Sequence, residues 1–161
     1  MNSISKEIIK ITEDFHSHYI HLDEEITSFQ LAEDKWSLKQ IIGHLIDSAS
    51  NNHQRFIRLQ LQDNITFSDY DKDEWLSLEK HNLIPYKTLL DLLANFNSLL
   101  AHLIANIDPD TLQNKWIVDW DENTNYMTLE KLIEHYLWHL KYHIGHFVER
   151  LNEINDREIG R

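Results

Sequence analysis

Histidine is the residue with the greatest chemical potential in this sequence, because the chain contains 11 histidines and no cysteine. Two of them, His139 and His143, are four residues apart in a segment whose apolar residues recur with a helical period. Side chains at this spacing point the same way from a helix and can chelate one metal ion. A helical projection places His143 within the apolar arc and His139 at its edge. Taken alone, the pair is equally compatible with two structural residues, because a histidine-rich chain forms such pairs by chance.

A second polar pattern occurs in residues 38–61. His44, Ser48, Asn51 and Arg55 follow one another at intervals of four, three and four residues, which places them in one stripe beside the apolar arc of a helix. A solvated helix face carries Lys and Glu more often than this combination of imidazole, hydroxyl, amide and guanidinium. The stripe therefore indicates the wall of a wet pocket, and an ordinary surface stripe is the alternative.

The two segments together offer three neutral imidazoles, from His44, His139 and His143. Three protein ligands leave at least one coordination position open, which is typical of a catalytic metal site. Imidazole suits zinc, nickel, copper and iron, and we expect zinc or nickel. A fourth protein ligand would indicate a closed structural site instead, and the candidates for it are His135, His146 and Asp47.

The elements that must position these residues are predicted to be helices. Only 3 Gly and 2 Pro occur in 161 residues, which is too few turn-forming residues for a fold of many strands and tight turns. Apolar periodicity and capping signals, including the capping box of Ser37 and Gln40, predict four amphipathic helices. We expect them over residues 3–28, 37–61, 85–107 and 128–154, with an ordered loop and a short helix near 72–80 between the second and third. The fold class is therefore all-α, a four-helix bundle forming a single domain over 1–161.

Charge and composition exclude several classes of function. A formal net charge of −12 without a basic cluster argues against nucleic-acid binding. No apolar run approaches the roughly 20 residues that span a bilayer, and the first ten residues lack the pattern of a signal peptide. We therefore expect no membrane association, and the absence of cysteine is compatible with a cytoplasmic location.

Several motifs of the sequence resemble those of the DinB-like superfamily, in particular its YfiT-like branch of metal-dependent hydrolases, which is related to bacillithiol S-transferases. The similar segments are Lys35-Trp36-Ser37-Leu38-Lys39, His44-Leu45-Ile46-Asp47-Ser48 with Asn51 and Arg55, Tyr70-Asp71-Lys72-Asp73-Glu74-Trp75, and Trp138-His139-Leu140-Lys141-Tyr142-His143-Ile144-Gly145-His146. The resemblance places the family's metal ligands on His44, His139 and His143. It implies an up-down-down-up bundle, often dimeric, with the metal at one end in a pocket closed by loops.

Further residues are expected around the ligands. The resemblance suggests Trp138, next to a ligand, and Arg55, on the polar stripe, as pocket residues, and each could equally pack on a neighbouring helix. Asp47 could orient an imidazole through its carboxylate, although a solvated position is the simpler reading. His146 is a candidate for the same surroundings.

Two classes of function follow. In the first, the chain is an enzyme whose metal lowers the pKa of a bound water or of a low-molecular-weight thiol, giving hydrolysis or thiol S-transfer on a small-molecule substrate. In the second, it is a non-catalytic metal-binding or stress-response module that binds a ligand. The second stays open because no residue of the sequence is fixed as a general base.

Overall fold

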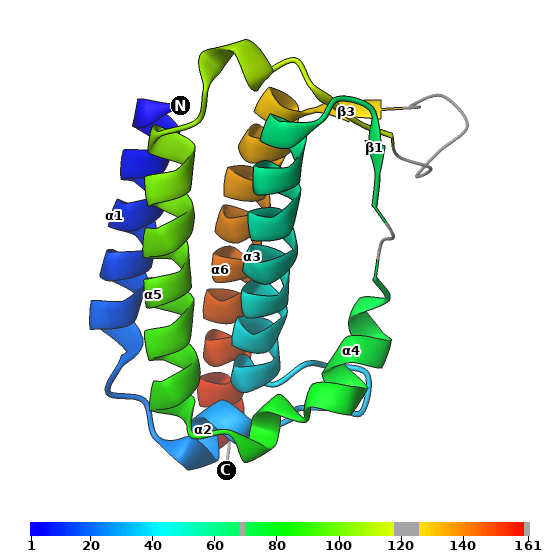
Figure 1. The fold of residues 1–161 in the computed structure, drawn as a ribbon. Coiled ribbons are helices and arrows are strands. Elements are labelled where there is room, and N and C mark those ends of the chain that lie inside the picture. The colour runs from blue at the N-terminus through cyan, green and yellow to red at the C-terminus, as the bar shows by residue number, and fades with distance from the viewer. Residues whose placement is uncertain (68–69, 118–125, 160–161) are drawn as a thin grey trace.

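The computed structural model describes residues 1–67, 70–117 and 126–159, and the architecture is a bundle of four long helices (Figure 1). These helices are α1 (Asn2–Tyr19), α3 (Leu38–Leu61), α5 (Tyr86–Ala105) and α6 (Leu129–Ile159). Helix α1 packs mainly on α5, α5 also on α3, and α3 on α6. The predicted all-α bundle is confirmed.

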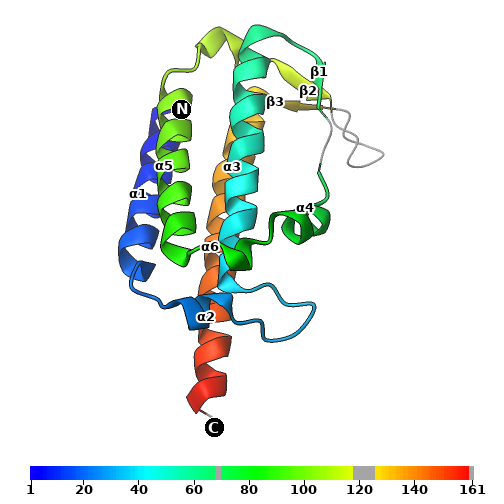
Figure 2. The ribbon, with the colours of Figure 1, turned by 60° about the horizontal axis from the view of Figure 1, so that its bottom comes forward.

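The helices follow an up-down-down-up course, as the resemblance implied. In Figure 1, α3 and α5 run in the same direction, and α1 and α6 run opposite to them. The chain leaving α3 must therefore return along the length of the bundle before α5 can begin. It does so through β1 (Ile65–Thr66), α4 (Lys72–Glu79) and the 3₁₀ turn η1 (His81–Leu83), which lie outside α3 (Figure 2). The predicted short helix at 72–80 is α4, and residues 68–69 of the predicted loop lie outside the described residues.

The first predicted helix, 3–28, is wrong in one respect. Helix α1 ends at Tyr19, and a separate short helix, α2, covers Glu24–Ser28. Asp23 begins α2 because its carboxylate accepts a hydrogen bond from the Ile26 N–H at 3.0 Å. The apolar stripe continued through the break, so periodicity alone merged the two helices.

A small three-stranded sheet is a second difference from the predicted all-helical pattern. Strand β2 (Lys115–Ile117) lies between β1, to which it is parallel, and β3 (Tyr126–Thr128), to which it is antiparallel. Trp116 of β2 is 1% exposed and anchors the sheet in the core. The sheet thereby fixes the chain that leads into α6.

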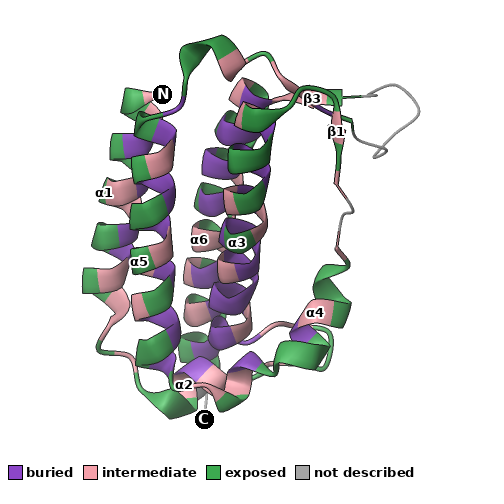
Figure 3. Ribbon diagram, viewed as in Figure 1, coloured by how far each residue is buried: buried purple, intermediate pink, exposed green. Residues whose placement is uncertain are grey.

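The core lies between the helices, where their buried faces meet (Figure 3). Buried hydrogen bonds also join the helices: the Tyr136 hydroxyl of α6 donates to Asn97 Oδ1 of α5 at 2.6 Å, and the Ser5 hydroxyl of α1 donates to the Ala101 carbonyl of α5 at 2.7 Å. Among the described helices only α5 is long and apolar enough to cross a membrane. This is weak evidence for a span, because the core helix of a globular bundle has the same character and α5 packs on α1 and α3.

Candidate metal centre

Helix caps set the positions of the three candidate ligands. Helix α3 begins with the predicted capping box: Ser37 Oγ accepts from the Gln40 N–H at 3.2 Å, and Gln40 Oε1 accepts from the Ser37 N–H at 2.9 Å. Helix α6 follows Thr128, whose Oγ1 accepts from the Lys131 N–H at 3.3 Å. His44 therefore lies about two turns into α3, on the face packed against α6.

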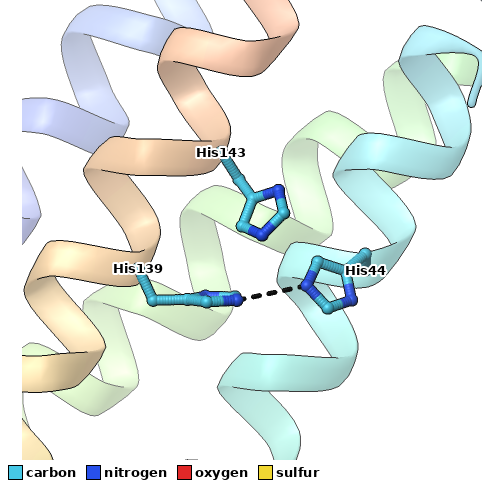
Figure 4. Close-up of side chains that lie close together, drawn as sticks. All are labelled: His44, His139 and His143. Atoms are coloured by element: carbon cyan, nitrogen blue, oxygen red, sulfur yellow. Dashed lines mark hydrogen bonds between the residues drawn. The ribbon is translucent and has the colours of Figure 1, made fainter. Parts of the chain in front are cut away.

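The structure brings His44, His139 and His143 together between α3 and α6 (Figure 4). The Nε2 atoms of His44 and His139 are 3.1 Å apart, and the His143 ring centroid is 4.5 Å from each of the other two. One nitrogen from each ring lies within 4.8 Å of the others. Among the described residues no fourth histidine or carboxylate belongs to this group. Three nitrogen donors at this separation could bind a single divalent ion.

The three imidazoles are held in the neutral state that metal binding requires. Burial first, and then the neighbouring imidazoles, lowers the pKa of His44 to about 3, that of His139 to about 4 and that of His143 to about 3. His44 and His143 each also have a buried Nδ1 without a partner in the described chain. The cluster thus contains ring nitrogens that its protein contacts leave unpaired, which fits a bound cation.

A cleft of about 380 Å³ opens beside His44 and His139. Ser48 and Arg55 of the predicted stripe line it, and Ser48 Oγ is 3.4 Å from His139 Nδ1. The Arg55 guanidinium lies 4.1 Å over the ring of Trp116, so the small sheet supports it. Three of the four stripe residues, His44, Ser48 and Arg55, therefore line a cleft rather than a solvated surface.

Other residues of the predicted surroundings lie elsewhere. Asn51 does not line this cleft, and its side chain donates to the Asp47 carbonyl at 2.9 Å. Asn52 lines the cleft instead, because the phase of α3 directs this residue inward. Trp138 is 57% exposed and stacks on Tyr142, so it lies on the outer face of α6.

Asp47 and His146 also lie outside direct contact with the three clustered histidines. Asp47 is buried, with its carboxyl beside that of Glu79, so the solvated reading is wrong. His146 has its ring centroid 6.0 Å from that of His143 and its Nε2 3.3 Å from an Arg150 nitrogen. It borders a second cleft, of about 410 Å³, which His143 also lines.

The structure adds residues that the sequence did not identify as part of the site. Trp36 lies beside the cluster, with its ring centroid 5.2 Å from that of His44 and 6.3 Å from that of His143. Lys72 lies at both clefts, 5.5 Å over the Trp36 ring. The first cleft is completed by Tyr70, Asp71 and Leu132, and by His135, which the sequence had offered only as a possible fourth ligand. For Tyr70, Asp71 and Lys72, the only signal in the sequence was their position in the segment Tyr70–Trp75, which resembles the family. Their separation in sequence from the histidines follows no helical period, so it does not predict that they lie near the cluster.

Comparisons with known proteins identify related chains and a shared fold. A "Putative metal-dependent hydrolase" of Halalkalibacterium halodurans is 27% identical over 146 residues, covering 91% of this chain and 83% of the relative. Another protein of that name, from Oceanobacillus iheyensis, is 28% identical over 130 residues, covering 79% and 72%. The solved structure of YfiT from Bacillus subtilis shares the fold, with a TM-score of 0.81. The two sequences are 18% identical, and the match covers 95% of this chain and 86% of YfiT. YfiT is described as "a probable metal-dependent hydrolase with an unusual four-helix bundle topology". The family model of the DinB superfamily matches residues 9–147, which include all three clustered histidines, and the chain therefore belongs to the DinB superfamily.

Proposed function

We propose that this protein is a metal-dependent enzyme in which His44, His139 and His143 hold one divalent ion, zinc or nickel first among the candidates. The observation that carries the proposal is the convergence of three neutral imidazoles from two helices, two of which, His44 and His139, line a cleft. A divalent ion held by three imidazoles retains an open position and supplies Lewis acidity that lowers the pKa of water or of a thiol. The names of the relatives support a metal-dependent hydrolase.

The cleft residues support a small substrate with an anionic group. A volume of about 380 Å³ suits a small molecule. Arg55 and Lys72 bring positive charge to this cleft, although the chain as a whole has a net charge of −12. A guanidinium held over Trp116 is preorganised to bind a carboxylate or a phosphate. We therefore infer that Arg55 orients the substrate at the cluster.

His135 is the candidate for moving a proton in this cleft. Its ring centroid is 6.3 Å from that of His139, and it lines the same cleft. Burial first, and then the charge of Arg55, lowers its pKa, so that the imidazole is neutral and can accept a proton near pH 7. This assignment gives hydrolysis or thiol activation a base that the sequence did not identify.

Two reactions fit the proposed enzyme, and they differ in the nucleophile. Water gives hydrolysis, and a low-molecular-weight thiol gives S-transfer to an electrophile. The thiol reaction is implied by the resemblance, and the hydrolase by the relatives' names. Assays with an activated ester and with a thiol plus an electrophile separate the two.

The test begins with metal content, measured by elemental analysis of untagged protein prepared without a nickel resin. We expect about one zinc or nickel per chain, lost in His44→Ala and His139→Ala and kept in His102→Ala, an exposed control on α5. Metal-dependent turnover that falls in His135→Gln while the metal is retained would support the proposed base. A protein that takes up neither zinc nor nickel would refute the proposal.

A non-catalytic metal-binding module is the second candidate. It is favoured by the role of Asp71, a carboxylate that lines the first cleft. Asp71 Oδ1 accepts hydrogen bonds from the Asp73 and Glu74 N–H groups and so caps α4 instead of serving as a general base. Bound metal without turnover of either reaction would select this candidate. The expected homodimer and cytoplasmic location stay predictions, and light scattering of the purified protein tests the first.

A further inference from the structure

A second group of side chains able to bind a metal lies where α4 and η1 pack on α3. Asp47 belongs to α3, Glu79 is the last residue of α4, and His81 is the first residue of η1. One potential ligand atom from each lies within 4.8 Å of the other two. His81 Nε2 is 2.9 Å from Glu79 Oε2, and the carboxyl groups of Asp47 and Glu79 are within hydrogen-bonding reach. Three different elements therefore converge on one point.

Burial makes this group more than an acidic surface cluster. Asp47 is 4% exposed and His81 5% exposed, and Asp47 Oδ2 has no hydrogen-bond partner within the described ranges. Leaving such an atom buried and unpaired is costly, and two adjacent carboxylates repel each other. The arrangement therefore requires either a shared proton or a cation between the carboxylates.

We propose that Asp47, Glu79 and His81 bind a second divalent cation. Two carboxylates with one imidazole differ from the three-histidine cluster, since oxygen ligands favour Mn²⁺ while imidazole alone favours zinc, nickel or copper. The Glu79 side chain is 37% exposed, which gives a cation a route from solvent. The cation would use the unpaired oxygen of Asp47 and compensate both negative charges. Without it, burial and then Glu79 raise the pKa of Asp47 to about 8, so that the pair retains a proton instead.

This cation would support the cleft without taking part in it. Glu79 is at the carboxyl end of α4, and Lys72, at the other end of this eight-residue helix, lines the cleft. A ligand bond from Glu79 to an ion also held by Asp47 would tie α4 to α3. The proposal is independent of the function proposed for the three histidines, because the two groups share no residue.

Mn²⁺ binding to the full chain tests the proposal. The double variant His139→Ala/His143→Ala removes two of the three clustered imidazoles and leaves α3 unchanged. In this background, Glu79→Gln removes a proposed ligand, and Glu74→Gln is a matched control with the same charge change at an exposed position of the same helix. Free Mn²⁺ is counted by electron paramagnetic resonance during titration at pH 7.5, and circular dichroism checks that each variant is folded.

We expect one Mn²⁺ per chain in the double variant, unchanged with Glu74→Gln and weakened at least about tenfold with Glu79→Gln. His81→Gln is a second ligand variant and is expected to weaken binding in the same way. Absence of Mn²⁺ binding in the double variant would overturn the proposal, as would equal binding by the Glu79→Gln and Glu74→Gln proteins. Since only His44 of the three-histidine cluster remains in this background, failure of the intact cluster to bind metal would leave these results unaffected.

Discussion

Acidification is expected to destabilise the metal-free protein through the three buried histidines. Burial lowers the pKa of His44 and His143 to about 3 and that of His139 to about 4. A histidine in the unfolded chain titrates near about pH 6.5. Between these values the unfolded chain binds more protons than the folded protein, so the free energy of unfolding falls as the pH falls. The effect is absent well above pH 6.5 and grows down to the folded pKa values.

The magnitude follows from proton linkage. Between pH 7 and pH 5, one such histidine lowers the free energy of unfolding by about 2 kcal/mol, and the three together by up to about 6 kcal/mol. A typical domain has only about 5–15 kcal/mol of stability, so the loss would be large. Urea unfolding followed by circular dichroism at pH 7, 6 and 5, with a chelator present, measures it directly.

A single substitution separates this effect from other titrating groups. His143→Gln removes one buried imidazole and is expected to reduce the loss between pH 7 and pH 5 by about 2 kcal/mol. His102→Gln, at an exposed position of α5, should leave the loss as in the wild type. If His143→Gln and His102→Gln lose the same free energy as the wild type, the cluster is not held neutral by burial and the reasoning is wrong.

Two further substitutions test packing, each measured by urea unfolding at pH 7.5. A Cβ at Gly43 would lie 2.3–2.5 Å from ring atoms of His81, so Gly43→Ala should lower the free energy of unfolding by about 1–3 kcal/mol. A Cβ at Gly145 meets open space, so Gly145→Ala should raise it by about 0.5–1 kcal/mol. Equal effects of the two substitutions would contradict the contact between Gly43 and His81. Tyr136→Phe leaves Asn97 Oδ1 buried without its donor and should cost about 1–3 kcal/mol, against almost nothing for the exposed Tyr142→Phe, and a neutral Tyr136→Phe would show that the hydrogen bond contributes little.

The sequence predicted the elements of the site whose positions depend on a single helix. His139 and His143 share a helical face, and the capping box of Ser37 and Gln40 fixes the start of the helix that carries His44. Helical phase is a local property, so the histidines on the inner side of each helix could be identified, and the resemblance to the family supported joining them in one site. A one-residue error in phase was already enough to choose Asn51 in place of Asn52 as a cleft residue. The break after Tyr19 was missed for a related reason, because an apolar stripe does not record whether the backbone between its residues stays helical.

The positions of the other site residues depend on the topology of the bundle, which no local sequence pattern predicts. Because α3 and α5 run in the same direction, the segment between them must travel the length of the bundle, and here it passes outside α3. This passage brings Tyr70 and Lys72 to the three-histidine cluster and Glu79 and His81 to Asp47. Their spacing in sequence has no fixed relation to helical period, so only the fold connects them to the histidines. It follows that a relative could keep the three histidines and change this segment alone, and its cleft would then differ in charge and shape while the imidazole cluster stayed the same.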